Sequence, residues 1–416
     1  MLDAFEKHLG PLKKYFDKLN RFELKVGRLP DWFWPPFYAF IFSRVVVFFA
    51  AYFGEIMIKT GREQEFYHLA PDNLFFDVMA RWDSGFYVNI AEEGYMLIFG
   101  RISNVAFFPL YPLLTSLVNT VFNNTVVSGV IVSHISFFIA LIYLYRLTEK
   151  LTNDETAKRT IFYLSVFPTS IFFSAVYTES LFLCVSVAAV YYAKMRNWEL
   201  ATLFTLLAGV TRITGVLVLG VVALEWLHSH GWTLLTIYKK EAWTNLWSGI
   251  KTDWYNLGFI LLAPLGLLSH MLFLSDQFQD PMAFWSVQSA FNRTNLGPIG
   301  ILIRDFRPIM SQDFMTGGIW WNVLWDTIAA FFALVATPFV FRRFGEGFTL
   351  YILLSILIPL SSGTGSMTRY IVVLFPLFML LGIWGEREGV NRFCQTFFPI
   401  FLGIFTAVFV NWIFLA

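Results

Sequence analysis

Long apolar runs separated by short polar connections dominate this sequence and restrict the folds it can adopt. A transmembrane helix needs roughly 20 mostly apolar residues, and a helix satisfies its own backbone hydrogen bonds inside a bilayer. The runs cover residues 36–58, 126–147, 159–175, 180–194, 198–211, 213–228, 256–274, 319–341, 348–361, 368–384 and 396–415. They predict an all-α polytopic membrane protein with about eleven transmembrane helices.

Composition and charge agree with this fold class. Charged residues make up 14% of the chain, compared with about 25% in soluble domains. The formal net charge of +1 gives a nucleic-acid partner no electrostatic support. Cys184 and Cys394 lie in or beside apolar runs, and the histidines are scattered along the chain. These patterns indicate no disulfide framework and no metal centre, so we expect no cofactor.

The distribution of lysine and arginine predicts the orientation. Residues 1–35 are basic at first and lack an early apolar core, as expected of a cytoplasmic amphipathic leader. Prolines interrupt residues 105–122, so this piece is expected to lie on the outer surface rather than cross. The basic connections then face the cytoplasm. The predicted first external, catalytic loop covers residues 59–125, and a second external loop covers 275–318.

The same reasoning divides the chain into a membrane module at 36–228 and a C-terminal membrane module at 229–416. It also places five ionisable residues on the outer side. Ionisable residues beside or within transmembrane segments are costly and usually functional, so one polar site is predicted there. These residues are Asp83, Glu179, Arg212, Arg293 and Arg369.

Asp83 is the candidate general base, because a carboxylate can take the proton of a sugar hydroxyl as the new bond forms. An alternative is that Asp83 caps the helix that follows it. Arg81 could contact a lipid headgroup, and Glu92 could belong to a solvated helix face. Gln288, in the second external loop, could bind sugar hydroxyls.

Arg212 and Arg369 are the candidate phosphate ligands. The planar guanidinium of Arg212 suits a phosphate, although Arg212 could instead form a structural ion pair with Glu179. Arg369 follows the Gly/Ser-rich stretch 361–366, where backbone amides and an arginine could bind an anion. The alternative for Arg369 is a positive charge at an ordinary helix end.

Together these segments resemble the PIG-V family, which comprises GPI mannosyltransferase 2 and its prokaryotic relatives. The resemblance extends over about residues 80–385, and its 280–293 part is closer to the prokaryotic relatives. It lies in Arg81-Trp82-Asp83, Ile90-Ala91-Glu92, Gly94-Tyr95, Phe107-Phe108-Pro109, Tyr111-Pro112, Tyr177-Thr178-Glu179-Ser180-Leu181-Phe182, Thr211-Arg212, Gly215, Asp280-Pro281, Ala283-Phe284, Gln288, Arg293 and Thr368-Arg369-Tyr370.

The resemblance implies a GT-C fold with external juxtamembrane helices in the first loop. It also implies an external active site, a polyprenyl-phosphate mannose donor of the dolichyl-phosphate type, and Asp83 as the catalytic residue. Donor phosphate would contact Arg212, Arg369 and Tyr370. Further substrate contacts would come from Arg81, Trp82, Glu92, Tyr111, Tyr177, Glu179, Gln288 and Arg293.

We therefore expect an inverting transfer of mannose to a lipid-linked or glycan acceptor among membrane lipids. The location would be a prokaryotic cytoplasmic membrane rather than the endoplasmic reticulum. Lipid phosphate is already a fair leaving group, so the chemistry does not require a metal. The alternative is a lipid or sugar transporter or flippase. Transporters often contain inverted repeats and broken helices that meet at the bilayer midplane, whereas this chain has no visible repeat and its candidate charges lie at one surface.

Overall fold

The computed structural model describes residues 29–58, 68–98, 100–291, 293–306 and 319–413. Residues 36–416 form one compact unit. Most of the predicted leader, residues 1–28, therefore lies outside the described residues, and so do 59–67 and 307–318 of the two predicted external loops. The division at 228/229 stays a prediction.

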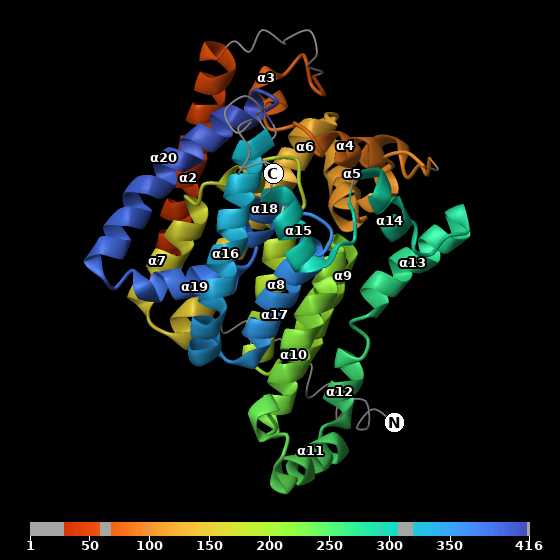
Figure 1. Cartoon of the computed structure of the whole chain (residues 1–416), viewed down its shortest axis with the longest axis vertical. Helices are drawn as coiled ribbons and strands as arrows, with labels where there is room; N and C mark the ends of the chain where they lie inside the picture. Colours follow the sequence, from red (N-terminus) through yellow and green to blue (C-terminus); the bar gives the residue numbers. More distant parts are fainter. Residues whose placement is uncertain (1–28, 59–67, 99, 292, 307–318, 414–416) are drawn as a thin grey trace, which may run out of the picture. The chain divides into compact units, whose positions relative to one another are not determined.

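The described residues contain helices and no strand, which confirms the predicted all-α class. Figure 1 gives their order along the chain. The α-helices are α2 (Trp34–Met57), α3 (Leu74–Asp77), α4 (Ser84–Glu93), α5 (Leu110–Phe122), α6 (Thr125–Leu151), α7 (Asp154–Ser165), α8 (Glu179–Lys194), α9 (Trp198–Thr211), α10 (Val216–Ser229), α11 (Lys240–Thr252), α12 (Trp254–Ile260), α13 (Leu265–Phe278), α14 (Ala283–Ser286), α15 (Gly297–Phe306), α16 (Ile319–Phe344), α17 (Glu346–Leu360), α18 (Met367–Val372), α19 (Phe375–Trp384) and α20 (Glu388–Val410). The 3-10 turns are η1 (Asp31–Phe33), η3 (Asn104–Ala106), η4 (Ser170–Phe173), η5 (Ile213–Gly215), η6 (Leu234–Thr236) and η7 (Val287–Phe291).

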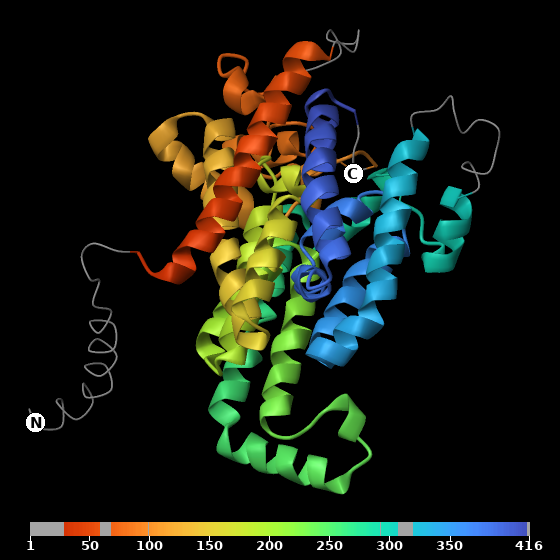
Figure 2. The same cartoon turned by 90° about the vertical axis from the view of Figure 1, so that its left-hand side faces the viewer.

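Five helical segments among the described residues are long and apolar enough to cross a bilayer. Several others are apolar but shorter, such as α9, α10 and α17. Within residues 36–416, helices α8, α9, α10, α17 and α16 form a row in which each packs against the next, and α6 packs against α8 (Figures 1 and 2). The long segments are Asp31–Met57, Thr125–Leu151, Trp254–Phe278, Asn322–Phe344 and Glu388–Val410.

An asparagine N-cap precedes each of the helices α6, α7 and α9. The side chains of Asn124, Asn153 and Asn197 each accept a hydrogen bond from the backbone N–H three residues ahead, at the start of α6, α7 and α9. An N-cap of this kind satisfies one of the backbone donors that a helix leaves unpaired, and typically contributes about 1 kcal/mol. These caps fix where the chain reverses between neighbouring helices.

Helix α5 lies against one end of α6 instead of running its full length. Its 13 residues span about 20 Å, less than the roughly 30 Å of a bilayer core. Tyr111, near the start of α5, donates a hydrogen bond to the carbonyl of Gly129, only four residues into α6. The end of α5 leads directly into α6 through Asn123 and Asn124. Helix α5 therefore packs along the first part of α6, where Tyr111 also contacts Ser133, and the surface position expected from its prolines stays a prediction.

A buried arginine fixes the segment that precedes α8. Arg44, on α2, is 4% exposed. Its guanidinium donates to the backbone carbonyls of Ser165 and Ser170 and to the hydroxyls of Ser170 and Ser174. These contacts fix the segment between α7 and α8, including η4, which leads to Tyr177 and Glu179.

The end of α20 contacts both α2 and the loop before α4. Asn411, just after α20, donates to the carbonyl of Gly54 on α2, and the carbonyl of Val410 accepts from the guanidinium of Arg81. The ring of Trp412 lies 5.8 Å from that of Trp82. The end of α20 therefore holds the loop that carries Asp83.

Close packing of α9 and α13 depends on Gly266, and this predicts the effect of a single methyl group. A Cβ at residue 266 would lie 2.2 Å from the backbone oxygen of Leu206, so Gly266→Ala must push the helices apart. We expect a loss of about 1–3 kcal/mol, measured as a lower melting temperature of the purified protein. Gly220→Ala, on α10, is the matched control because a Cβ there meets no neighbour within 4 Å. Equal melting temperatures for both variants would contradict the packing argument.

Candidate active site

The loop before α4 presents Asp83 at the edge of the bundle. Trp82 adopts a left-handed backbone conformation with φ 54°. The buried hydroxyl of Tyr177 accepts from the N–H of Asp83 at 3.1 Å and donates to the carbonyl of Arg81 at 3.2 Å. Burial raises the pKa of Tyr177 well above its ordinary value, so this hydroxyl keeps the proton that it donates. Tyr177 therefore fixes the loop at the residue that carries the candidate carboxylate.

Asp83 stands at the N-cap position of α4, but its side chain makes no capping hydrogen bond. Its Oδ2 instead accepts from Arg369 Nη1 at 2.6 Å. The side chain of Asp83 is 28% exposed, compared with 1% for Glu179. Asp83 is thus the more accessible of the two carboxylates, and it is held by an arginine 286 residues further along the chain.

Arg369 is positioned by an aspartate about two turns into α16. The carboxylate of Asp326 accepts from the backbone N–H groups of Ser366 and Thr368 and from the hydroxyl of Thr368. These bonds satisfy backbone donors at the start of α18, as an N-cap does. Asp326 therefore fixes the short helix from which Arg369 reaches the site.

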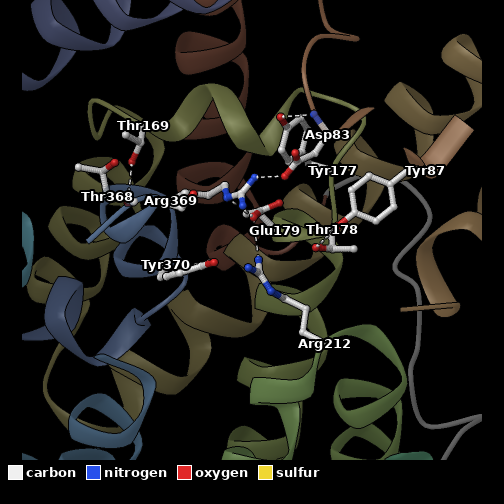
Figure 3. Close-up of polar contacts among 12 residues, drawn as sticks. Asp83, Tyr87, Thr169, Tyr177, Thr178, Glu179, Arg212, Thr368, Arg369 and Tyr370 are labelled. Atoms are coloured by element: carbon white, nitrogen blue, oxygen red, sulfur yellow. Dashed lines mark hydrogen bonds and ion pairs between the residues drawn. The ribbon is translucent and has the colours of Figure 1, made fainter. Parts of the chain in front are cut away.

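Glu179, the first residue of α8, lies between two arginines (Figure 3). Its Oε1 is 2.7 Å from Arg212 Nη1 and 3.6 Å from Arg369 Nε. An isolated carboxylate could not be buried at this depth without a compensating positive charge. The structural ion pair considered for Arg212 and Glu179 is therefore present, and Arg369 shares in it.

Tyr370 contacts all three arginines of the site. Its hydroxyl accepts from Arg293 Nη2 at 3.1 Å. The guanidinium carbons of Arg212 and Arg369 lie 5.5 and 5.8 Å from the centre of its ring. Arg293, from the predicted second external loop, thereby joins residues from α8, α18 and the position just after α9.

The cluster consists of Asp83, Glu179, Arg212, Arg293 and Arg369, and it carries an excess of one positive charge. Three guanidinium groups face two carboxylates within the contacts given above. Charge-assisted hydrogen bonds from arginine suit phosphate as well as carboxylate. The cluster can therefore accept one further anion, and a phosphate group would balance its charge.

The other predicted site residues lie around this cluster in supporting or separate positions. Arg81 is fully buried and binds Asp77 and the carbonyl of Val410. Tyr111 is also fully buried and binds Gly129 and Ser133. Glu92 is exposed near the end of α4, and Gln288 donates to the carbonyl of Phe284 nearby in its own segment. The structure thus gives Arg81 and Tyr111 contacts within the protein.

Among the described residues, no group of three histidine, cysteine, aspartate or glutamate side chains is arranged to hold a metal ion.

Residues 64–248 match the mannosyltransferase (PIG-V) family. The resemblance expected from the sequence is confirmed over these residues. The PIG-V match contains Asp83, Tyr177, Glu179 and Arg212, and it supports a membrane glycosyltransferase. No match was found among curated proteins.

Three solved structures from Archaeoglobus fulgidus are similar to the chain. An oligosaccharyltransferase complex with Zn and sulfate has 12% identity and a TM-score of 0.47, with 80% of this chain and 48% of that chain covered. The apo form has 10% identity and a TM-score of 0.44, with 89% and 54% covered. The oligosaccharyltransferase AglB with an inhibitory peptide and a dolichol-phosphate has 11% identity and a TM-score of 0.38, with 90% and 55% covered. The chain spans about half the length of these structures.

Sequence reasoning missed Asp326 and Arg44, although the signal was present. Each is a charged residue inside a predominantly apolar run. Glu179 and Arg212 were singled out because ionisable residues in or beside transmembrane segments are costly and usually functional. The same argument applies to Asp326 and Arg44. Asp326 supports Arg369, and Arg44 supports the approach to Glu179, so both residues position the cluster.

The contacts of Arg81 predict a structural effect when it is removed. Hydrogen bonds from His68, Ala70 and Arg81 outweigh the effect of burial and hold the pKa of Asp77 below its ordinary value, so this carboxylate is ionised. Arg81→Ala would leave that charge without its arginine partner, at a cost of about 3–5 kcal/mol. We expect a marked fall in melting temperature, whereas Arg101→Ala, at an exposed arginine of the same loop, should have little effect. A stable Arg81→Ala protein that fails only in substrate binding would favour the original substrate-contact interpretation.

Proposed function

We propose that the protein is an inverting mannosyltransferase of the GT-C type that uses a polyprenyl-phosphate mannose donor. The observation that carries this proposal is an accessible carboxylate, Asp83, paired with Arg369 at one side of a cluster of three arginines and two carboxylates that has one positive charge in excess. A sugar transferred from a lipid phosphate needs both features. The nucleophile requires a base, and the leaving phosphate requires positive charge.

In the proposed reaction Asp83 takes the proton of an acceptor hydroxyl. The acceptor oxygen attacks the anomeric carbon of mannose from the face opposite the phosphate. The bond between that carbon and the phosphate oxygen breaks, and its electron pair leaves with the lipid phosphate. Arg212, Arg293 and Arg369 would stabilise the charge that develops on the phosphate, with Tyr370 placed between them.

The ion pair between Asp83 and Arg369 links donor binding to the activation of the base. Arg369 Nη1 lies 2.6 Å from Asp83 Oδ2, so in the free protein the arginine competes with any acceptor hydroxyl for this carboxylate. A donor phosphate would draw Arg369 towards itself. We infer that donor binding weakens this ion pair and frees Asp83 to accept a proton.

The remaining features of the proposal follow from the sequence. The acceptor would be a lipid-linked or glycan hydroxyl, the active site would face the exterior of a prokaryotic cytoplasmic membrane, and no metal cofactor would take part. Trp82, Glu92 and Gln288 remain candidate substrate contacts around the cluster. Product formation in the presence of a chelator would test the metal requirement.

The direct test is incubation of the purified protein with labelled polyprenyl-phosphate mannose and a membrane lipid extract, followed by product identification. The expected product is a mannosylated acceptor of inverted anomeric configuration. Movement of intact donor across vesicle membranes, with no new glycosidic bond, would instead identify a transporter or flippase.

Asp83→Asn should abolish transfer while leaving the protein folded. The amide has nearly the same shape as the carboxylate but cannot accept the proton. The measurement is product formation at saturating donor, with melting temperature as the check on folding. Glu93→Gln is the matched control, because it removes an exposed carboxylate from α4, ten residues away in sequence. Near-normal turnover by Asp83→Asn would remove Asp83 from its role as base.

Substitutions at Arg212 and Glu179 distinguish two roles for Arg212, a structural ion pair with Glu179 and a ligand for the donor phosphate. Arg212→Ala removes the nearer partner of the buried Glu179 carboxylate, so it should lower the melting temperature. Loss of its charge-assisted contact, at roughly 1.5–3 kcal/mol, should also weaken catalytic efficiency about 10- to 150-fold. Arg369→Lys should retain only part of the activity, since lysine lacks the bidentate fork. The double variant Arg212→Met with Glu179→Gln should recover stability but not activity, as measured by melting temperature and donor affinity. Full activity of the double variant would show that Arg212 serves only to neutralise Glu179.

A further inference from the structure

A second polar feature lies at the far end of α16 from the charge cluster. Asp326, which supports Arg369, and Arg342 are sixteen residues apart on this helix, or roughly 24 Å along its axis. There, α16 and α19 form a pocket of about 440 Å³. Its walls include Phe339, Leu380 and Trp384, and its rim carries Arg342 and Arg343. The pocket thus combines apolar walls with two positive charges.

The positive charge of this pocket is not balanced by its surroundings. Arg342 and Arg343 are both exposed, and within the described ranges neither forms an ion pair. Glu386 also lines the pocket, but it lies 3.8 Å from Arg159, which supplies a positive charge of its own. Two guanidinium groups are therefore available to a negatively charged ligand.

An apolar stripe on α16 leads away from these arginines. Phe331, Val335 and Phe339 are spaced four residues apart, so they lie on one face of the helix. Their exposed fractions are 67%, 48% and 44%. Phe339 belongs to both features, because it lines the pocket and its ring lies 5.5 Å from that of Trp384, edge to face. The stripe provides a path for a hydrocarbon chain that starts at the pocket.

We propose that this pocket binds the phosphate headgroup of an anionic phospholipid, with one acyl chain along the stripe. A basic pocket between transmembrane helices is suited to an anionic headgroup, and the exposed aromatic and aliphatic side chains are suited to the chain below it. A zwitterionic lipid would offset its phosphate with its own ammonium group and bind less well. This site is separate from the Asp83 cluster, and the proposal does not depend on glycosyl transfer.

The test is native mass spectrometry of the full-length protein in detergent, titrated with phosphatidylglycerol or phosphatidylcholine. Wild-type protein should retain phosphatidylglycerol in preference to phosphatidylcholine. The double variant Arg342→Gln/Arg343→Gln should lose that preference, with affinity for phosphatidylglycerol reduced about tenfold or more. Inorganic phosphate at the same concentration should not displace the bound lipid, because it cannot use the apolar stripe. Displacement by phosphate would overturn the proposal that the ligand is a lipid.

Lys239→Gln/Lys240→Gln is the matched control, since it removes two exposed positive charges near the start of α11, outside the pocket. It should leave binding of phosphatidylglycerol unchanged. An equal loss in both double variants would show diffuse charge attraction rather than a site, and no loss in the arginine variant would also overturn the proposal. If that variant does not fold, the single changes Arg342→Gln and Arg343→Gln carry the same test, each with a smaller expected reduction.

Discussion

The buried carboxylate of Glu179 is the constraint on which the candidate active site depends. A charge that is 1% exposed in a predominantly apolar bundle requires a partner, since removal of a carboxylate from water is costly. Arg212 supplies the nearer positive charge and Arg369 the second. Glu179 thus allows two arginines to lie close together, where without it they would repel each other.

Residues outside the cluster fix the positions of Arg369 and Asp83. Asp326 fixes the start of α18 and so the position of Arg369. Tyr177 fixes the backbone at Asp83, and the end of α20 holds the same loop through Arg81. The supporting residues are buried, whereas Asp83 is partly exposed. A rigid base beside preorganised positive charge is the arrangement that electrostatic catalysis requires.

The helices and the members of the cluster could be predicted from the sequence, but their pairing could not. Apolar runs indicate helices, and charges beside such runs attract attention because they are costly there. That argument found all five members of the cluster, Asp83, Glu179, Arg212, Arg293 and Arg369. It could not show that Arg369 reaches Asp83, because nothing in the local sequence links residues 286 positions apart. Motif resemblance also gave Arg81 as a substrate contact, whereas its contacts in the structure are with Asp77 and Val410.

The central claim is that the arginines around Glu179 form a binding site for lipid phosphate. It is tested most directly by a structure of the protein with polyprenyl phosphate bound. The account predicts that the phosphate oxygens lie within hydrogen-bond distance of at least two of Arg212, Arg293 and Arg369, and that the contact between Arg369 and Asp83 has lengthened. A phosphate bound elsewhere, with that ion pair still at 2.6 Å, would contradict it.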